Sequence, residues 1–258
     1  MRVIPRFRRR SDEQRTGTMT VMEHLEELRH RIIICIIAVA CGAVVGWFLY
    51  APFMRLILGP YCDFVATHPD IAPSEGCRLN YLGVVDGLVV KLKIVLFLGL
   101  VCVLPIVLYQ LWAFITPGLT SREKRWALPF VFASTFLFLL GGVVAYVTLP
   151  KALDFLLGFA GEFAVPLITF DRYVGFVTLV TLAFGLSFLF PVVLVFLELV
   201  GILNPNTLSH WRRWAILGIA VFAAVITPSS DPYTMLAMMI PMYLFYEASI
   251  IIGRMLKR

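Results

Sequence analysis

Two carboxylates beside apolar segments are the side chains of this sequence best suited to chemistry, and that chemistry would be pairing with cations. Glu27 falls on the polar face of an amphipathic helix that we predict over residues 20–31. Glu123 stands at the start of a later apolar segment. The helix is predicted because apolar residues recur at helical spacing: Val21, Met22, Leu25, Leu28 and Ile32.

Each carboxylate also has an ordinary structural explanation. Glu27 and Arg31 are four residues apart on the predicted helix, and such a pair contributes only about 0.2–0.5 kcal/mol. Glu123 follows Thr120 by three residues, which is the spacing of a helix capping box. The residues alone therefore leave a binding role and a structural role open for both side chains.

The sequence carries no pattern typical of catalysis. It has no glycine-rich nucleotide loop, no HExxH, no GxSxG and no paired cysteines at metal-binding spacing. The predicted apolar segments contain almost no charge, whereas proton-relaying transporters place carboxylates or histidines at mid-depth. We therefore expect a protein that is not an enzyme and that uses no cofactor and no metal. The histidines lie outside these segments without ligand spacing: His24, His30, His68 and His210.

The elements that must position any site are membrane helices. The 258 residues are 60% hydrophobic and 15% charged, whereas soluble domains carry about a quarter charged residues. The apolar residues form continuous runs, which favour helices over a barrel, each long enough to cross a hydrocarbon core of about 30 Å. We predict an all-α membrane protein with a single domain over residues 20–254, between a disordered basic tail, 1–19, and a C-terminal tail, 255–258. Its six spans are 32–50, 92–115, 127–149, 173–199, 213–228 and 233–253.

The distribution of basic residues predicts the orientation. With six spans, the N-terminal tail, residues 116–126, residues 200–213 and the C-terminal tail share one side. That side holds 16 of the 22 lysine and arginine residues. Cytoplasmic loops are enriched in these residues, so we expect both termini in the cytoplasm. The same distribution explains the net charge of +6 without nucleic acid as a partner.

The last two spans are predicted to be short, and three spans are predicted to be kinked. The uninterrupted apolar part of the fifth span, residues 215–226, would cover only about 18 Å. The turn-forming residues 227–232 follow it directly. Pro105, Pro191 and Pro241 lie inside spans, where a proline removes a backbone donor and bends the helix.

Two of the five cysteines, Cys62 and Cys77, lie in the predicted first outer loop, residues 51–91. An oxidising compartment would favour a disulfide between them, and two free thiols are the alternative. The other three lie within spans and are expected to be small packing residues: Cys35, Cys41 and Cys102.

Several motifs occur in a consistent order along residues 20–254. Together they resemble the TatC family, the core subunit of the twin-arginine protein translocase. The segments that carry the resemblance are residues 23–31, residues 104–119 with 122–125, residues 184–188 with 190–191, Thr227 and Pro228, Asp231, and residues 241–243.

This resemblance implies a receptor rather than an enzyme. The family binds folded cargo proteins through signal peptides that bear consecutive arginines, and it assembles with single-span TatA and TatB subunits. Transport is driven by the proton-motive force, which agrees with the missing nucleotide motif. The resemblance implies a location in the plasma membrane. It also implies the lipid bilayer, those subunits, cargo signal peptides and further copies of the chain in a larger complex as partners.

The resemblance also assigns roles to individual residues. Glu27 and Glu123 match the carboxylates implicated in signal-peptide recognition, where they would accept hydrogen bonds from guanidinium groups. Matching residues that shape this site or lie beside it are Phe114, Pro117, Leu119, Arg29 and Arg31. Matching positions outside it are Pro60, Tyr146 and Asp231. Leu189 is a departure, because the family commonly has Glu or Gln there, and a polar group at that position is thought to recruit partner helices or water.

Two other functions remain as alternatives. A small-solute transporter or channel would predict a polar stripe or an inverted repeat across the spans, and the sequence shows neither. A membrane scaffold would organise other subunits without binding a peptide. Crosslinking of a twin-arginine peptide near Glu27 and Glu123 would separate these alternatives from the receptor.

Overall fold

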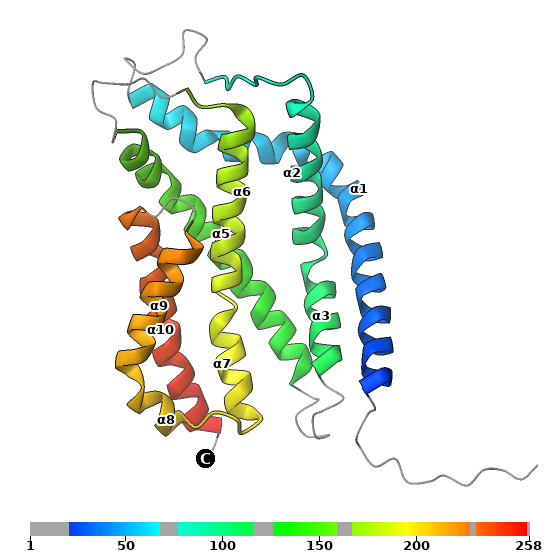
Figure 1. Cartoon of the computed structure of the whole chain (residues 1–258), viewed down its shortest axis with the longest axis vertical. Coiled ribbons are helices and arrows are strands. Elements are labelled where there is room, and N and C mark those ends of the chain that lie inside the picture. Colours follow the sequence, from blue (N-terminus) through cyan, green and yellow to red (C-terminus); the bar gives the residue numbers. More distant parts are fainter. Residues whose placement is uncertain (1–20, 68–76, 116–125, 159–166, 228–230, 257–258) are drawn as a thin grey trace, which may run out of the picture.

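The computed structural model describes residues 21–67, 77–115, 126–158, 167–227 and 231–256. These residues form an elongated bundle of helices (Figure 1), and among them the only strand-like pairing is an isolated bridge between Asn80 and Thr169. The helices are α1 Val21–Thr67, α2 Asp86–Cys102, α3 Leu104–Ile115, α5 Ala127–Gly158, α6 Phe170–Ser187, α7 Phe190–Leu199, α8 Pro205–His210, α9 Arg212–Ile226 and α10 Pro232–Leu256.

The all-helical, multi-span class is confirmed, while the number of six spans stays a prediction. Four helical segments in the described part of the chain are long and apolar enough to cross a membrane: α1, α5, α6 with α7, and α10. The pair α2 and α3, bent by 61°, would supply a fifth. Helix α9 has 15 residues, about 22 Å, and lies at the predicted fifth span.

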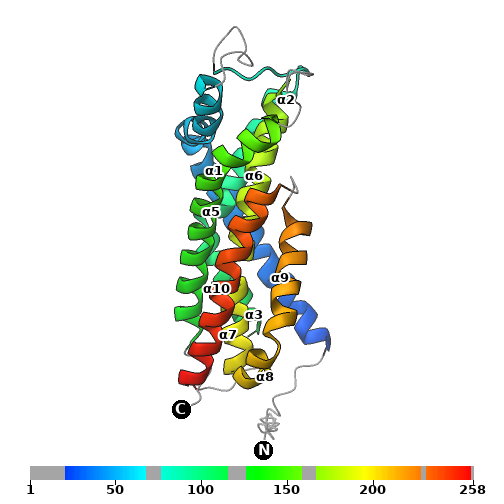
Figure 2. The same ribbon diagram turned by 90° about the vertical axis from the view of Figure 1, so that its left-hand side faces the viewer.

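The ends of the helices gather at two opposite ends of the bundle. Helix α1 begins at the end that holds α8, and α10 ends there as well (Figures 1 and 2). In both views the end of α9 and the start of α10 stop short of the level that α2 and α6 reach at the end of the bundle opposite α8. The prediction that the fifth span is short therefore agrees with the structure, in which α9 has 15 residues.

Two expectations about element length are wrong. Helix α10 has 25 residues and is not short, because Pro232 occupies its tolerated first turn and Pro241 is accommodated within it. Helix α1 runs to Thr67 through Pro52 and Pro60, so the first residues of the predicted outer loop are helical. Figure 1 shows this second half of α1 turning across the end of the bundle.

Burial explains why α1 continues beyond the predicted span. Met54, Ile57, Tyr61 and Phe64 recur at intervals of three or four residues and are all buried. They join a core cluster with residues of α2, α5 and α6, such as Leu149. The apolar contacts of this face offset the hydrogen bonds that the two prolines remove.

The predicted kinks at Pro105 and Pro191 coincide with breaks between helices. Helix α2 ends at Cys102 and α3 begins at Leu104, while α6 ends at Ser187 and α7 begins at Phe190. Each break precedes its proline within one turn, which is where a proline removes the backbone hydrogen bond and clashes with the preceding turn.

Cys62 and Cys77 are joined by a disulfide in the structure, with Cα atoms 5.1 Å apart, so the bond would tie the end of α1 to the segment before α2. We expect alkylation of the denatured, unreduced protein to leave both sulfurs unmodified. Mass spectrometry should find three alkylated cysteines before reduction and five after it, because the others are free thiols. Five alkylated cysteines before reduction would contradict the prediction.

Candidate functional site

Helix α1 presents a carboxylate that is already paired with an arginine one turn away. Arg31 donates from Nε and Nη2 to Oε1 of Glu27, at 3.1 and 2.6 Å. The two side chains are only 21% and 20% exposed. His24, Glu27 and Arg31 share one face of the helix because they are spaced by three and four residues. This pair is therefore more sheltered than an ordinary surface ion pair.

Helix α3 brings two further side chains to this face of α1. Arg31 also donates from Nη1 to Oε1 of Gln110, at 3.0 Å. The ring of His24 stacks on that of Phe114, with centroids 4.3 Å apart. Gln110 and Phe114 are four residues apart and so lie on one face of α3. The first turns of α1 and the last turns of α3 thus build one cluster.

The second oxygen of Glu27, Oε2, is buried and has no hydrogen-bond partner among the described residues. Buried carboxylate oxygens are normally hydrogen-bonded, because leaving one unsatisfied costs about 1–3 kcal/mol or more. Oε1 accepts both bonds from Arg31, so the remaining acceptor capacity of Glu27 is concentrated on Oε2. The cluster is therefore chemically suited to bind a further donor, such as a guanidinium group.

The structure brings only some of the predicted site residues together. Glu27, Arg31 and Phe114 belong to the cluster, and Arg29 is exposed on the same turns of α1. The remaining predicted members lie outside the described residues: Pro117, Leu119 and Glu123. The convergence of Glu27 and Glu123 thus remains a prediction.

Sequence reasoning missed the roles of Gln110 and His24. Both lie inside the quoted motifs, and each is at helical spacing from a predicted site residue: His24 from Glu27, and Gln110 from Phe114. Helical periodicity could have put them on the right faces. It could not have shown that those two faces meet, because that depends on how α1 packs against α3.

Two of the other matched positions lie in the apolar core. Pro60 is buried in the second half of α1. Tyr146 on α5 packs against the same core cluster, and a Cβ on Gly59 would lie 3.1 Å from its hydroxyl oxygen. Tyr146 therefore belongs to the packing of α5 against α1, and Pro60 is buried next to the glycine that Tyr146 approaches.

Asp231 is buried and caps α10. Its Oδ1 accepts a hydrogen bond from the backbone nitrogen of Thr234 at 2.7 Å, and its Oδ2 accepts one from the Thr234 hydroxyl at 2.5 Å. Pro232 then occupies the first helical position, where its missing N–H is not needed. The side chain fixes the start of α10.

We expect Asp231→Ala to destabilise the protein by about 1 kcal/mol, because Ala cannot bond the first turn of α10. Asp231→Asn should recover most of this loss, since Asn is an equally good cap. Thermal unfolding of the purified protein would measure both. Equal destabilisation by Asn and Ala would show that the negative charge, and not the cap, is what the protein needs.

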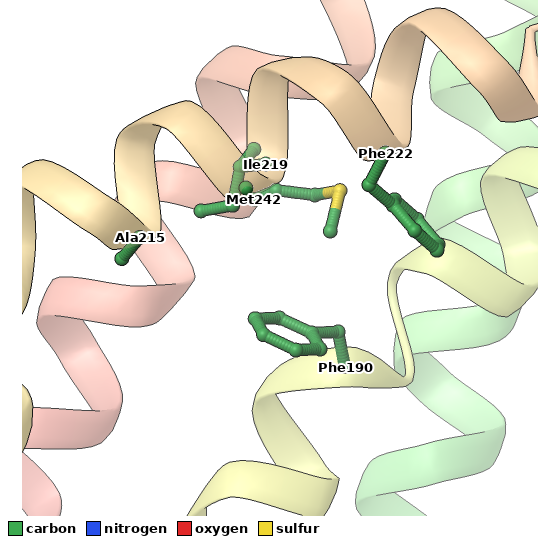
Figure 3. A pocket seen from close by; sticks show the side chains of 6 residues that line it. Phe190, Ala215, Ile219, Phe222 and Met242 are labelled. Carbon is green, nitrogen blue, oxygen red and sulfur yellow. The ribbon is translucent and has the colours of Figure 1, made fainter.

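Leu189 lies in the break between α6 and α7, and Phe190 is the first residue of α7. Leu189 packs with the cluster that contains Trp112 and Phe138. Phe190 lines a pocket of about 280 Å³ between α7, α9 and α10 (Figure 3). The lining side chains drawn there are apolar, so the pocket offers partners shape and apolar surface but no side-chain hydrogen bond.

The described part of the chain contains no group of three or more His, Cys, Asp or Glu residues able to hold a metal ion. Polar and stacking contacts where α1 meets α3 join His24, Glu27, Arg31, Gln110 and Phe114. We call these five residues the α1–α3 cluster. Its chemistry is that of ion pairing and stacking.

Known proteins resemble this chain over most of its length. Residues 23–241 match the family model described as Sec-independent protein translocase protein (TatC). The TatC protein of Frankia casuarinae is 42% identical over 248 residues, which cover 95% of this chain and 68% of that protein. The TatC protein of Aquifex aeolicus is 36% identical over 243 residues, covering 93% of this chain and 97% of that protein.

A solved structure supports the same relationship. The crystal structure of a twin arginine translocase receptor, TatC, superposes with a TM-score of 0.71 at 36% sequence identity. The match covers 92% of this chain and 100% of that chain. At this identity and coverage, the likeness extends beyond the general shape of a helical bundle.

Proposed function

We propose, because this chain belongs to the TatC family of Sec-independent protein translocase proteins, that it recognises the twin-arginine signal peptides of folded cargo proteins. The family supplies a component of a protein translocase and not an enzyme. The observation that supports recognition most directly is the α1–α3 cluster, where a sheltered Glu27 retains an unbonded oxygen.

The chemistry of the cluster suits a guanidinium ligand. A carboxylate accepts charge-assisted hydrogen bonds from a planar fork of N–H donors, and Phe114 adds an aromatic surface on which a guanidinium can stack. We propose that Glu123 contributes the second carboxylate, on the basis of the family motif. Two fixed acceptors on a basic face would favour a ligand with two adjacent arginines.

We propose the plasma membrane as the location, with both termini and the α1–α3 cluster on the cytoplasmic side. The bias of lysine and arginine residues supports this orientation, as does the common end of the bundle at which α1 begins and α10 ends. Transport would then be driven by the proton-motive force. Signal peptides reach the cytoplasmic face first, so a receptor site is needed there.

We propose single-span TatA and TatB subunits as partners, with further copies of this chain in the complex. The apolar pocket at Phe190 supports contact with a membrane helix, because it opens between α7 and the short helix α9. With Leu189 in place of a polar residue, such a helix would be held by packing rather than by a hydrogen bond to that position.

Site-directed photocrosslinking tests the receptor function. A photoreactive residue at position 24 or 114 should crosslink to a twin-arginine signal peptide, and much less to its twin-lysine counterpart. A photoreactive residue at position 179, which is exposed on α6, serves as the control. Equal crosslinking of both peptides at positions 24 and 114 would count against the receptor and in favour of a scaffold.

Cysteine accessibility tests the orientation. Single cysteines within residues 116–126, in a variant whose native free cysteines are replaced by serine, should react with a membrane-impermeant reagent only after the cells are opened. The reason is the excess of basic residues on that side. A cysteine at position 84, which is exposed between the disulfide and α2, should react in intact cells. If position 84 reacted only after the cells were opened and residues 116–126 reacted in intact cells, the orientation would be opposite to the one proposed.

A further inference from the structure

We propose that Arg31 is an internal competitor of the ligand: Arg31 is bonded to Glu27 in the absence of a signal peptide, and an arginine of the signal peptide displaces it. The inference rests on the proposed function and concerns the same site. It assigns Arg31 the role of lowering the affinity of the site for every cationic peptide. Its basis is the geometry of Arg31 between Glu27 and Gln110.

Arg31 satisfies Glu27 in the way that a ligand arginine would. Two of its N–H groups converge on Oε1 of Glu27, at 3.1 and 2.6 Å. Both partners are about one fifth exposed, so solvent competes with the pair less than at an open surface. A guanidinium from a peptide must therefore replace an existing guanidinium rather than fill an empty site.

Gln110 anchors Arg31 from the neighbouring helix. The hydrogen bond from Nη1 to Gln110, at 3.0 Å, uses an N–H that Glu27 does not use. When a peptide takes Glu27, this bond can remain, so the displaced Arg31 still has an acceptor. The anchor therefore lowers the cost of exchange and holds Arg31 near Glu27, ready to return after release.

The buried oxygen of Glu27 is the place where exchange can begin. Oε2 is covered and has no hydrogen-bond partner among the described residues. An incoming cation reaches it only when the atoms that cover it move, and Arg31 is already bonded to the other oxygen of the same carboxylate. A carboxylate shared between two guanidinium groups is a reasonable intermediate, because its two oxygens can each accept bonds.

Competition of this kind lowers the affinity of all cationic ligands by the same factor. It does not change the ratio between a twin-arginine and a twin-lysine peptide. It raises the concentration at which a weakly binding cationic peptide would occupy the site. A ligand with two well-held guanidinium groups still binds. Arg31 thus prevents weakly bound cationic peptides from occupying Glu27 unproductively.

The test measures peptide affinity for the full-length purified protein. Arg31→Gln should tighten binding of both the twin-arginine and the twin-lysine peptide by about three- to tenfold, which corresponds to an ion pair of roughly 1 kcal/mol. Arg31→Lys should also tighten binding, by less, because an ammonium group keeps the charge but loses the fork that spans Glu27 and Gln110. Arg254→Gln, a charge change on the exposed last turn of α10, should change little.

The double variants connect the gain to Glu27. In a Glu27→Gln background, Arg31→Gln should produce no further tightening, since no competing pair remains. Unchanged or weaker binding in Arg31→Gln would overturn the inference, as would a gain that is absent in Arg31→Lys or equal in Arg254→Gln. If Arg31→Gln fails to fold, Arg31→Lys carries the test alone. Failure of the proposed function would look different, because Glu27→Gln would then leave twin-arginine binding intact in the otherwise native protein.

Discussion

Replacing Glu27 by glutamine is expected to weaken binding of a twin-arginine peptide by roughly ten- to a hundredfold. A hydrogen bond to a charged group contributes about 1.5–3 kcal/mol, and each 1.4 kcal/mol is a factor of ten in affinity. Glutamine keeps the size of the side chain and one acceptor oxygen but loses the charge. Titration of a labelled twin-arginine peptide into the purified variant measures the loss, and Glu123→Gln should behave similarly.

The structural explanations of the two carboxylates predict a different outcome. A capping-box residue tolerates glutamine, so Glu123→Gln would be almost silent if capping were its only role. A simple surface pair contributes little, so Glu27→Gln would also be almost silent. Glu26→Gln is the matched control, because Glu26 is exposed on the same turn of α1 and carries the same charge. A loss in Glu26→Gln equal to that in Glu27→Gln would mean that only net charge matters.

The sequence predicted the class of the fold better than its element boundaries. Long uncharged runs are sufficient to indicate membrane helices, and prolines at 105 and 191 mark the breaks because their effect is local. The end of α1 could not be predicted in this way. Pro52 and Pro60 argue for a loop, and only the tertiary burial of residues such as Tyr61 keeps the segment helical.

The candidate site was predictable only in part, for a related reason. Glu27 and Phe114 were identified through motifs that resemble the TatC family, and the family membership is confirmed. The hydrogen bond between Arg31 and Gln110 joins residues 79 positions apart. Local spacing reveals which face of a helix a residue occupies, but a contact of this range depends on the close packing of α1 against the bent pair α2 and α3.

That packing uses glycines, and replacing one of them should have a large effect. A Cβ on Gly99 of α2 would lie 2.6 Å from the backbone nitrogen of Ala43 on α1. A Cβ on Gly46 of α1 would lie 2.6 Å from the carbonyl oxygen of Val95. Small residues allow membrane helices to approach this closely. We therefore expect Gly99→Leu to destabilise the protein by about 3 kcal/mol or more, the upper range for overpacking, because backbone atoms cannot rotate away.

Thermal unfolding in detergent would measure this loss, with Gly175→Leu as the matched control. Gly175 on α6 has no heavy atom within 4 Å of its added Cβ, so the same substitution meets no neighbour there. Gly99→Ala should fall between the native protein and Gly99→Leu, since the clash begins at Cβ. Equal stability of the two leucine variants would refute the close contact. Because α2 continues into α3, which carries Gln110 and Phe114, Gly99→Leu should also weaken twin-arginine peptide binding, whereas Gly175→Leu should not.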